Sequence, residues 1–450
     1  MGKYFGTDGF RGKANIDLDS KHAFLIGSFF GKLAAEKSNS ESKIVIGQDT
    51  RKSGDMFVNS LAAGITSAGA DAFVLGTVPT PGVAFVTKSY GFNFGIMVSA
   101  SHNPFDDNGI KVLNSFGEKL SEDIILQCED YIDGGFDNAI RAQNSEIGTS
   151  RGFHSAHIRY MDKLKSCVSH SFDGLRIALD CANGSASNFA GDLFRDLGAD
   201  AHVIHNDPNG VNINTNCGST HLESLCKYVK DNNFDLGFAY DGDADRCLAV
   251  DRFGCEVSGD DLMLLCARNL KQKGKLNNNM LVTTIMSNFG LYKALDNLGI
   301  DYEKTNVGDK FVYENMSKNG HSIGGEQSGH IIFKDFATTG DGMLTSLMVV
   351  DSLIDLGETL DQANSKMKVY PQLLVNVTVN DKQSVMDDSD VEASIQKAED
   401  DLHGDGRVLV RPSGTEPFIR VMAEAGTDEL CENAVNSIID TIKSKGYIVD

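Results

Sequence analysis

The chain has 450 residues, and its 41% hydrophobic and 23% charged residues are the proportions of ordinary globular domains, which excludes a disordered protein. Its 63 acidic and 41 basic side chains give a formal net charge of −22, which opposes binding to nucleic acid and to anionic membranes. Residues 1–12 lack an apolar signal core, and no later run approaches the ~18 apolar residues of a membrane span. We expect a cytoplasmic protein of three or four domains, in which an anionic ligand requires a locally basic pocket.

Nine cysteines are spread along the chain, with no C-x-x-C pair and no histidine spacing typical of a metal site. We expect reduced thiols that serve mainly in packing. They are Cys128, Cys167, Cys181, Cys217, Cys226, Cys247, Cys255, Cys266 and Cys431.

A glycine-rich segment near the start of the chain carries one cation. Gly6–Gly9 and Gly12 surround Arg11, so its guanidinium has room to approach a phosphate closely. A simple tight turn explains the same residues, and the motif alone favours that turn.

A strand–helix–strand pattern occurs three times along the chain. The first copy starts with the apolar run Ile44–Ile46, continues through a helix to Ala68 and ends with the apolar run Ala72–Leu75. The other two copies begin at Ile177 and at Leu281. Each copy has a glycine and an aspartate before its second strand: Gly69-Ala70-Asp71, Gly198-Ala199-Asp200 and Gly299-Ile300-Asp301. Helical crossovers force parallel pairing, so we predict three similar α/β domains with mixed, mainly parallel sheets and loops at the carboxyl ends of their strands.

The pattern changes after Pro371, where Leu373–Val379 alternates between apolar and polar residues. A helix, a strand pair and a last helix follow, at Val391–Leu402, Arg407–Val410, Ile419–Ala423 and Glu429–Lys443. We predict a smaller C-terminal α+β domain. Asn144–Gly152 contains glycine and serine and lacks apolar periodicity, which places a first domain border near residue 150. With further borders near Gly254 and near Lys368–Pro371, we expect domains at residues 1–150, 151–253, 254–368 and 369–450.

The apolar run Phe94–Val98 leads into S-A-S-H-N-P-F-D-D-N-G, which we predict to be a loop over Ser99–Gly109. Pro104 fixes the local backbone, so the loop exposes the hydroxyl of Ser101 at a defined position, as a nucleophile requires. An ordinary serine-rich turn explains this stretch equally well.

Three carboxylates alternate with small residues in D-G-D-A-D-R, Asp241–Arg246, directly after the apolar run Leu236–Ala239. Hard oxygen ligands that converge in this way favour magnesium or calcium over zinc. A calcium-binding helix–loop–helix requires glycine and glutamate where Arg246 and Arg252 stand. A solvated acidic turn is the alternative, although such close like charges repel unless a cation joins them. Magnesium commonly takes phosphate oxygens at its open positions, so the loop indicates phosphoryl chemistry.

A second loop, G-G-E-Q-S-G-H at Gly324–His330, combines a carboxylate, a hydroxyl and an imidazole. Glu326 and Ser328 can hold adjacent sugar hydroxyls as acceptor and donor. The metalloprotease pattern H-E-x-x-H and the nucleophile elbow G-x-S-x-G are both absent from this loop. A structural hairpin is the alternative interpretation.

The C-terminal domain contains R-P-S-G-T-E-P at Arg411–Pro417, with Arg420 close behind. Its guanidinium, two hydroxyls and glycine-freed backbone N–H groups form a compact phosphate cradle, which is informative in so acidic a chain. The chain lacks the nucleotide-binding pattern G-x-x-x-x-G-K-S/T here.

Together these four loops resemble those of the α-D-phosphohexomutase superfamily, in its order and at its spacing, and the match covers nearly the whole chain. The chain is most similar to the branch that acts on glucosamine phosphates. Gln327, where the phosphomannomutase/phosphoglucomutase branch typically has methionine, modestly supports this assignment. Ala244 departs from the glycine frequent in this branch, but its methyl group should not obstruct a metal. Further matching segments are Lys3–Gly12, Asp180–Gly184, Asn212–His221, Met286–Leu291, Val307–Lys310, Thr338–Gly342 and Pro371–Val377.

The resemblance implies an isomerase that interconverts glucosamine 6-phosphate and glucosamine 1-phosphate through a phosphoserine at Ser101 and a bisphosphorylated sugar. The product would supply UDP-N-acetylglucosamine and cell-wall precursor synthesis. One Mg²⁺ per active site would be held by Ser101, Asp241, Asp243 and Asp245. The catalytic residues would be Ser101, Lys111, Arg246 and His330, with Lys111 and His330 as candidates for proton transfer. The substrate-binding residues would be Arg11, Glu326, Ser328, Arg411, Ser413, Gly414, Thr415 and Arg420.

Three alternatives compete with this interpretation. The first is a phosphomannomutase/phosphoglucomutase of the same superfamily. A phosphatase would have little use for a second phosphate cradle, and a non-catalytic sugar-phosphate sensor would have lost Ser101 or an aspartate ligand. The sequence leaves a homodimer open. We also expect the C-terminal domain to be a mobile lid that grips the phosphate that is not reacting.

Overall fold

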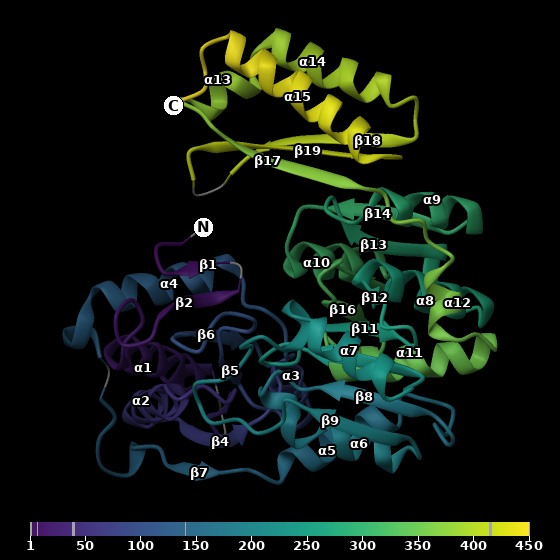
Figure 1. Cartoon of the computed structure of the whole chain (residues 1–450). Coiled ribbons are helices and arrows are strands. Elements are labelled where there is room, and N and C mark those ends of the chain that lie inside the picture. Colours follow the sequence, from purple (N-terminus) through teal and green to yellow (C-terminus); the bar gives the residue numbers. More distant parts are fainter. Residues whose placement is uncertain (1, 7, 38–40, 140, 414–415, 450) are drawn as a thin grey trace. The chain divides into compact units, whose positions relative to one another are not determined.

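The computed structural model describes residues 2–6, 8–37, 41–139, 141–413 and 416–449 (Figure 1). The chain divides into two compact units, Met1–Met286 with Ile300–Ser365, and Ser287–Gly299 with Lys366–Asp450. The first unit contains three β-sheets and the second contains one. Among the described residues, no helix combines the length and the apolar character required to cross a bilayer.

The first sheet has the strand order β1-β2-β6-β5-β3-β4-β7. Its strands are β1 (Phe5–Gly6), β2 (Gly9–Lys13), β3 (Lys43–Gln48), β4 (Asp71–Thr77), β5 (Phe94–Val98), β6 (Asp107–Leu113) and β7 (Ser150–Gly152). Strands β5, β3, β4 and β7 run parallel, and β6, β2 and β1 are antiparallel to their neighbours. The helices are α1 (Ser20–Lys37), α2 (Gly54–Ser67), α3 (Thr80–Ser89) and α4 (Glu122–Asp133).

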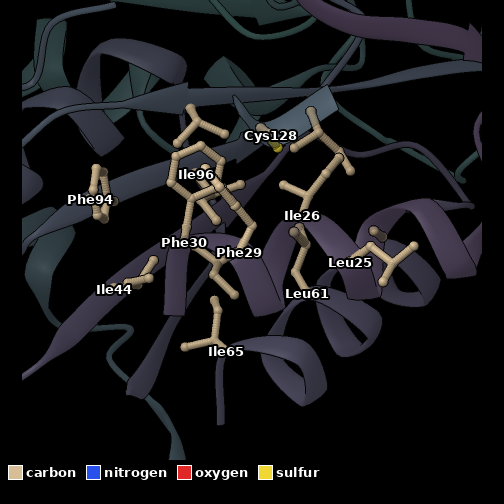
Figure 2. Close-up of a cluster of buried hydrophobic side chains, with 14 of the residues drawn as sticks. Leu25, Ile26, Phe29, Phe30, Ile44, Leu61, Ile65, Phe94, Ile96 and Cys128 are labelled. Atoms are coloured by element: carbon tan, nitrogen blue, oxygen red, sulfur yellow. The ribbon is translucent and has the colours of Figure 1, made fainter. Parts of the chain in front are cut away.

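Helices cover both faces of this sheet, as predicted. Ile44 and Ile46 of β3 pack with α1, α2 and α4, whereas Val45 between them packs with α3 on the other face, because successive strand residues alternate in direction. Figure 2 shows the larger cluster, in which side chains of α1 and α2 meet those of the strands. The two helices approach so closely that a Cβ at Gly64 would lie 2.1 Å from the carbonyl oxygen of Phe24.

The second and third sheets repeat the same plan. Their strand orders are β12-β11-β10-β8-β9 and β14-β13-β15-β16. The strands are β8 (Arg176–Asp180), β9 (Asp200–Ile204), β10 (Leu236–Tyr240), β11 (Cys247–Asp251), β12 (Glu256–Val257), β13 (Met280–Thr284), β14 (Asp301–Thr305), β15 (Ile323–Gly325) and β16 (Ile331–Phe333). The helices are α5 (Ala156–Lys165), α6 (Ala190–Asp196), α7 (Glu223–Asp231), α8 (Gly259–Gln272), α10 (Asp309–Asn319), α11 (Gly342–Leu356) and α12 (Leu360–Asn364). Short 3₁₀ turns lie at Gly135–Asn138, Asn144–Glu146, Ser185–Asn188, Gly218–Thr220 and Asn277–Asn279.

The predicted fold class is confirmed by these pairings. The three strand pairs expected from the repeated pattern, β3 with β4, β8 with β9, and β13 with β14, are all parallel. In each sheet a parallel strand also leads through a loop into an antiparallel neighbour, as β5–β6, β10–β11 and β15–β16. The three loops of the first unit that the sequence selected for chemistry are these three connections.

The predicted loop over residues 99–109 is wrong for its last three residues. Asp107 already begins β6, and residues 107–109 pair with Lys13, Gly12 and Arg11 of β2. The Asp-Asn-Gly composition indicated a turn, but the antiparallel partner β2 supplies backbone hydrogen bonds that hold it as strand. The loop that carries Ser101 is therefore residues 99–106, called the Ser101 loop below.

The second unit is the predicted small α+β domain together with α9 (Phe289–Leu298). Its antiparallel sheet has the order β17-β19-β18 and is covered by α14 and α15. Its elements are β17 (Gln372–Thr378), α13 (Lys382–Met386), α14 (Ser389–Asp401), β18 (Gly406–Pro412), β19 (Phe418–Ala425) and α15 (Asp428–Ser444). Helix α9 is joined to this sheet by the backbone N–H of Phe289, which donates to the Glu424 carboxylate at 2.9 Å.

Candidate active site

The Ser101 loop holds its serine in an unusual backbone conformation, with a φ of 53°. Non-glycine residues in this left-handed region need support from their surroundings. The N–H of Ser101 donates to Oγ of Ser99 at 2.9 Å, and its carbonyl oxygen accepts from Arg51 and Asn214, each at 2.8 Å. Both backbone groups of the candidate nucleophile are therefore fixed.

The side chain of Ser101 differs from the prediction in one respect. The prediction that the loop exposes the Ser101 hydroxyl is wrong, because only 1% of the residue's surface is accessible to solvent. Contacts from the neighbouring domain cover it, and these are invisible in a local sequence pattern. The Ser101 hydroxyl donates to Oδ2 of Asp241 at 2.5 Å, so the structure joins the Ser101 loop to residues 241–246, the acidic loop.

The three aspartates of the acidic loop are buried together. One carboxylate oxygen from each of Asp241, Asp243 and Asp245 lies within 4.8 Å of the other two. Within the described part of the chain, Oδ1 of Asp243 and Oδ1 of Asp245 are buried without a hydrogen-bond partner. Buried carboxylate oxygens require a cation or a donor, and hard oxygen ligands are those that Mg²⁺ prefers. The donor set therefore fits a magnesium ion.

The acidic loop also has a built-in positive partner. Lys111 of β6 donates to Oδ2 of Asp243 at 2.6 Å and to Oδ2 of Asp245 at 3.3 Å, and the Thr80 hydroxyl donates to Asp243 at 2.5 Å. Burial opposes ionisation of both Lys111 and Asp243. The charges of Asp243 and Asp245 together outweigh burial for Lys111, so its pKa lies above its usual value. The charge and hydrogen bond of Lys111, with the hydrogen bond from Thr80, outweigh burial for Asp243, so its pKa lies below its usual value. Burial and then its two acidic neighbours raise the pKa of Asp241.

His102, the residue after Ser101, lies near two arginine side chains. The charges of Arg246 and Arg11 add to burial in lowering the pKa of His102 to about 4, so this imidazole is neutral at pH 7. Its Nδ1 lies 3.4 Å from the Ser101 hydroxyl. Within the described residues, Nε of Arg246 and Nε of Arg11 are buried without a partner. In a chain of net charge −22, two arginines near His102 form a local concentration of positive charge.

Residues 326–330 form the hairpin loop between β15 and β16. The N–H of Glu326 donates to the carbonyl oxygen of His330 at 3.0 Å, which is the geometry of a structural hairpin. The same loop is bonded to the residue that directly follows the acidic loop, because the N–H of Cys247, the first residue of β11, donates to the carbonyl oxygen of Gly329 at 3.0 Å. The carboxylate of Glu326 accepts from the N–H of Gly308 at 3.0 Å. The structure therefore brings three of the four predicted loops together within the first unit.

The buried His330 begins a chain of ionisable side chains that are otherwise partly buried. Its Nε2 is 3.5 Å from Asp309, Asp309 accepts from Lys119 at 2.6 Å, and Lys119 also donates to Asp8 at 3.2 Å. A Cβ at Gly340 would lie 2.6 Å from the imidazole ring, so the ring is tightly enclosed. Asp8, Lys119 and Asp309 were not selected from the sequence, although two of them lie in segments that resemble the superfamily.

A cavity of about 340 Å³ adjoins this chain of charges. Its lining includes Lys111 of β6 and Asp245 of the acidic loop, and also Asp8, Lys119 and Asp309. Its wall thus includes side chains of the candidate active site.

The fourth predicted loop lies in the second unit. Arg411 of β18 is directly opposite Arg420 of β19, and burial followed by the charge of Arg420 lowers the pKa of Arg411. Oγ of Ser413 accepts from the N–H of Glu416 at 3.3 Å. Lys382, which was not predicted, donates to the carbonyl oxygen of Ser413 at 2.7 Å. The predicted residues Gly414 and Thr415 lie outside the described residues.

Family models of phosphoglucomutase/phosphomannomutase match four successive segments of the chain. They are α/β/α domain I over residues 2–138, domain II over 158–254, domain III over 258–370 and the C-terminal domain over 374–441. The chain is also 50% identical over 450 residues to the Lachnospira eligens protein named phosphoglucosamine mutase, covering 100% of both chains. The chain belongs to the phosphoglucomutase/phosphomannomutase family.

Other family members agree with this assignment. The Bacillus subtilis protein named phosphoglucosamine mutase is 46% identical over 445 residues, 99% of both chains. A family protein from Burkholderia thailandensis has the same fold, with a TM-score of 0.80, 23% identity and coverage of 98% of this chain and 97% of that one. The Aspergillus fumigatus N-acetylphosphoglucosamine mutase, solved with GlcNAc-6P and magnesium, has a TM-score of 0.68 at 18% identity, covering 98% and 96%. The family predicted from the four loops is thereby confirmed.

The residues that hold the Ser101 loop of this family member were also missed by sequence reasoning. Asp49, Arg51 and Ser99 are buried polar side chains of the first domain, and Asn214 reaches the loop from residues 212–221. The segment around Asn214 had been noted only as resembling the superfamily. The sole available signal was two charged residues directly after the strand β3, in Q-D-T-R.

Proposed function

We propose that the protein is a phosphoglucosamine mutase, an isomerase that interconverts glucosamine 6-phosphate and glucosamine 1-phosphate. The observation that carries this proposal is the hydrogen bond from the buried Ser101 hydroxyl to Asp241, within a cluster of three aspartates and near two partly buried arginines. A nucleophile, a cation site and an anion-binding surface are the components of phosphoryl transfer. The full-length similarity to relatives named phosphoglucosamine mutase supports the substrate class.

In the first half of the reaction, phosphorylated Ser101 donates its phosphoryl group to the free hydroxyl of the bound sugar phosphate. The P–O bond to Ser101 breaks, a P–O bond to the sugar forms, and the hydroxyl proton passes to His330 as the base. The released Ser101 oxygen takes a proton from Lys111, whose raised pKa keeps it protonated. The product is a bisphosphorylated sugar. After the sugar turns over, its other phosphoryl group returns to Ser101, and the net result is a moved phosphate.

Charge must be offset wherever the phosphoryl group moves. Magnesium, held by Asp241, Asp243, Asp245 and an oxygen at Ser101, would neutralise charge on that group. Arg246 contributes a cation at the end of the acidic loop, and Lys111 keeps Asp243 and Asp245 in place.

The remaining residues of the proposed site bind the substrate. Glu326 and Ser328 hold the sugar ring in either orientation, and Arg11 adds a cation on the side of His102. We propose that the distal phosphate is held by Arg411, Ser413, Gly414, Thr415 and Arg420. In this scheme the segments 1–150, 151–253, 254–368 and 369–450 are domains that each supply one loop.

We place this reaction in the cytoplasm, where it would feed the synthesis of UDP-N-acetylglucosamine and cell-wall precursors. The partner of the site is a phosphorylated amino sugar, and we expect no role for nucleic acid or membranes. The proposed site draws all its residues from one chain and therefore requires no second subunit. A homodimer in which each chain has its own site is compatible with the scheme.

Parallel assays of the purified protein on glucosamine, glucose and mannose 1-phosphates test this function. We expect the highest kcat/KM for glucosamine 1-phosphate. An equal or higher kcat/KM for glucose or mannose 1-phosphate would assign the protein to the phosphomannomutase/phosphoglucomutase branch. Stoichiometric release of inorganic phosphate without isomerisation would indicate a phosphatase instead.

A further inference from the structure

Arg51 is a buried arginine, 3% exposed, in the connection between β3 and α2. Its guanidinium donates to four backbone carbonyl groups in or next to the Ser101 loop. Nη2 donates to the carbonyl oxygens of Ser101 and Asn103, both at 2.8 Å. Nη1 donates to that of Asp107 at 3.1 Å and to that of Pro104. One side chain therefore holds the carbonyl groups of three residues of this loop and of the first residue of β6.

The same guanidinium is itself held in place. Its Nε donates to Oδ2 of Asp49 at 2.9 Å, and Asp49 also accepts from the Ser99 hydroxyl at 2.6 Å. Oγ of Ser99 in turn accepts from the N–H of Ser101. These bonds form a closed circuit in which Arg51 fixes the carbonyl side of Ser101 and Asp49, through Ser99, fixes its N–H side.

The second domain contacts the same carbonyl groups through Asn214. Its Nδ2 donates to the carbonyl oxygen of Ser101 at 2.8 Å and to that of Asn103 at 3.0 Å. The residues beside Arg51 are bonded to this domain too: the Thr50 hydroxyl donates to the carbonyl oxygen of Asn183 at 2.6 Å, and the N–H of Lys52 to that of Gly210 at 2.9 Å.

The acidic loop lies directly against this arrangement. A Cβ at Gly242 would lie 2.6 Å from the carbonyl oxygen of Ser101, closer than any side chain tolerates. Besides the hydrogen bond from the Ser101 hydroxyl to Asp241, the distance between Ser101 and the aspartates is therefore set by backbone that is held from both domains.

We propose that Arg51 and Asn214 are positioning residues that together clamp the Ser101 loop against the acidic loop, and so set the rate of phosphoryl transfer rather than the affinity for substrate. The inference rests on the proposed function. Displacing a reacting group by ~1 Å costs about 100-fold in rate, so a support of this kind acts on kcat. Lysine cannot replace Arg51, because a single ammonium lacks the planar fork that reaches several carbonyl groups and a carboxylate at once.

The test compares Arg51→Lys and Asn214→Ala with two matched controls. Arg176→Lys alters an arginine that also bonds an aspartate and two carbonyl groups, and Asn232→Ala alters an asparagine that bonds the carbonyl group of Tyr228, both outside the proposed site. Three quantities are measured: kcat, KM for glucosamine 1-phosphate, and the rate at which a hexose 1,6-bisphosphate phosphorylates Ser101, followed by intact-protein mass.

We expect Arg51→Lys to lower kcat and the phosphorylation rate by about 100-fold, with KM changed less than threefold. Asn214→Ala should act in the same direction with a smaller effect. The double variant should lose less than the product of the two single losses, because both side chains hold the same two carbonyl groups. Both controls should behave as wild type.

Wild-type phosphorylation rates in soluble Asn214→Ala and Arg51→Lys proteins would overturn the clamp, and so would a rise in KM at unchanged kcat. If Arg51→Lys does not fold, Asn214→Ala decides by the same criteria. If the wild-type protein isomerises glucosamine 1-phosphate and the variants have the same kcat and phosphorylation rate, the clamp alone is contradicted. Wild-type protein that accepts no phosphoryl group from the bisphosphate would overturn the proposed function and the clamp together.

Discussion

The hydroxyl of Ser101 donates a 2.5 Å hydrogen bond to Oδ2 of Asp241, across 140 positions of sequence. The donor and the acceptor come from different sheets, and each follows a strand of its own sheet. Phosphorylation of Ser101 would replace this donor by a dianion beside a carboxylate, an arrangement that is stable only with a cation present. This relationship leads to the first two predictions.

Ser101→Ala should lower mutase turnover by at least ~10³-fold, because the variant lacks the oxygen that carries the phosphoryl group. The lost hydrogen bond to Asp241 costs about 1–3 kcal/mol of stability, which leaves a chain of this size folded. Turnover and thermal unfolding are measured together, with the exposed Ser115→Ala as control. Turnover within tenfold of wild type would exclude Ser101 as the carrier.

Asp245→Asn should weaken magnesium binding by tenfold or more, because Oδ1 of Asp245 is one of the two buried carboxylate oxygens of the acidic loop that have no donor among the described residues. Chelator should abolish wild-type activity, and added Mg²⁺ should restore it. Calorimetric titration of the chelator-treated protein with Mg²⁺ measures the affinity, and the exposed Asp231→Asn serves as control. Full activity in excess chelator would contradict the metal assignment.

Much of the fold and three of the four loops were predictable because the relevant signals are local. The strand–helix–strand pattern and the acidic D-G-D-A-D-R segment each lie within a short stretch of sequence. Carboxyl ends of parallel strands meet at one edge of a sheet, so the position of a loop after a strand already placed it near the site.

The supporting residues could not be predicted, because their partners are distant in sequence. Arg51 bonds carbonyl groups about 50 residues away, and Lys119 bonds Asp309 across 190 positions. Every residue has a backbone carbonyl group, so the residue type does not indicate which carbonyl groups accept these hydrogen bonds. The burial of Ser101 has the same origin, because the side chains and backbone that cover it belong to another domain.

Asp341 gives a prediction about pH. It caps α11 by accepting from the N–H of Leu344, and it accepts from the Tyr160 hydroxyl, both at 2.9 Å. Burial raises its pKa to about 6 in spite of these two donors. The folded protein therefore holds a proton that the unfolded chain releases between pH 4 and 6, so this group lowers stability as the pH rises through that interval.

Asp341→Asn should remove that loss, because an amide stays neutral and still caps the helix. The difference in the free energy of unfolding between variant and wild type should rise by on the order of 2–3 kcal/mol from pH 4 to pH 7, at about 1.4 kcal/mol per pKa unit. Urea unfolding midpoints at the two pH values measure the change, with the exposed Asp335→Asn as control. An identical pH dependence in variant and wild type would show that Asp341 is ionised throughout.

The last prediction concerns Arg411 and Arg420, which face each other across β18 and β19. Like charges directly opposite each other destabilise a strand pair, and an anion bound by both side chains relieves that repulsion. A phosphate is such an anion, and two guanidinium groups bind it through several charge-assisted hydrogen bonds. We therefore expect the second unit to hold the phosphate that is not reacting.

One serine must serve both ends of one sugar, so the bisphosphate has to turn over within the site without escaping. A site that stays closed prevents turning, and a site that stays open loses the intermediate, so the phosphate grip has to release and close again. Arg411→Ala should raise KM by about 10- to 150-fold, the equivalent of 1.5–3 kcal/mol for a lost charge-assisted hydrogen bond, and should release more bisphosphate during turnover. Steady-state kinetics with mass-spectrometric detection of free bisphosphate measure both effects, and the exposed Lys397→Ala of the same unit is the control. Unchanged KM and kcat with no additional bisphosphate in solution would refute a gripping role for this unit.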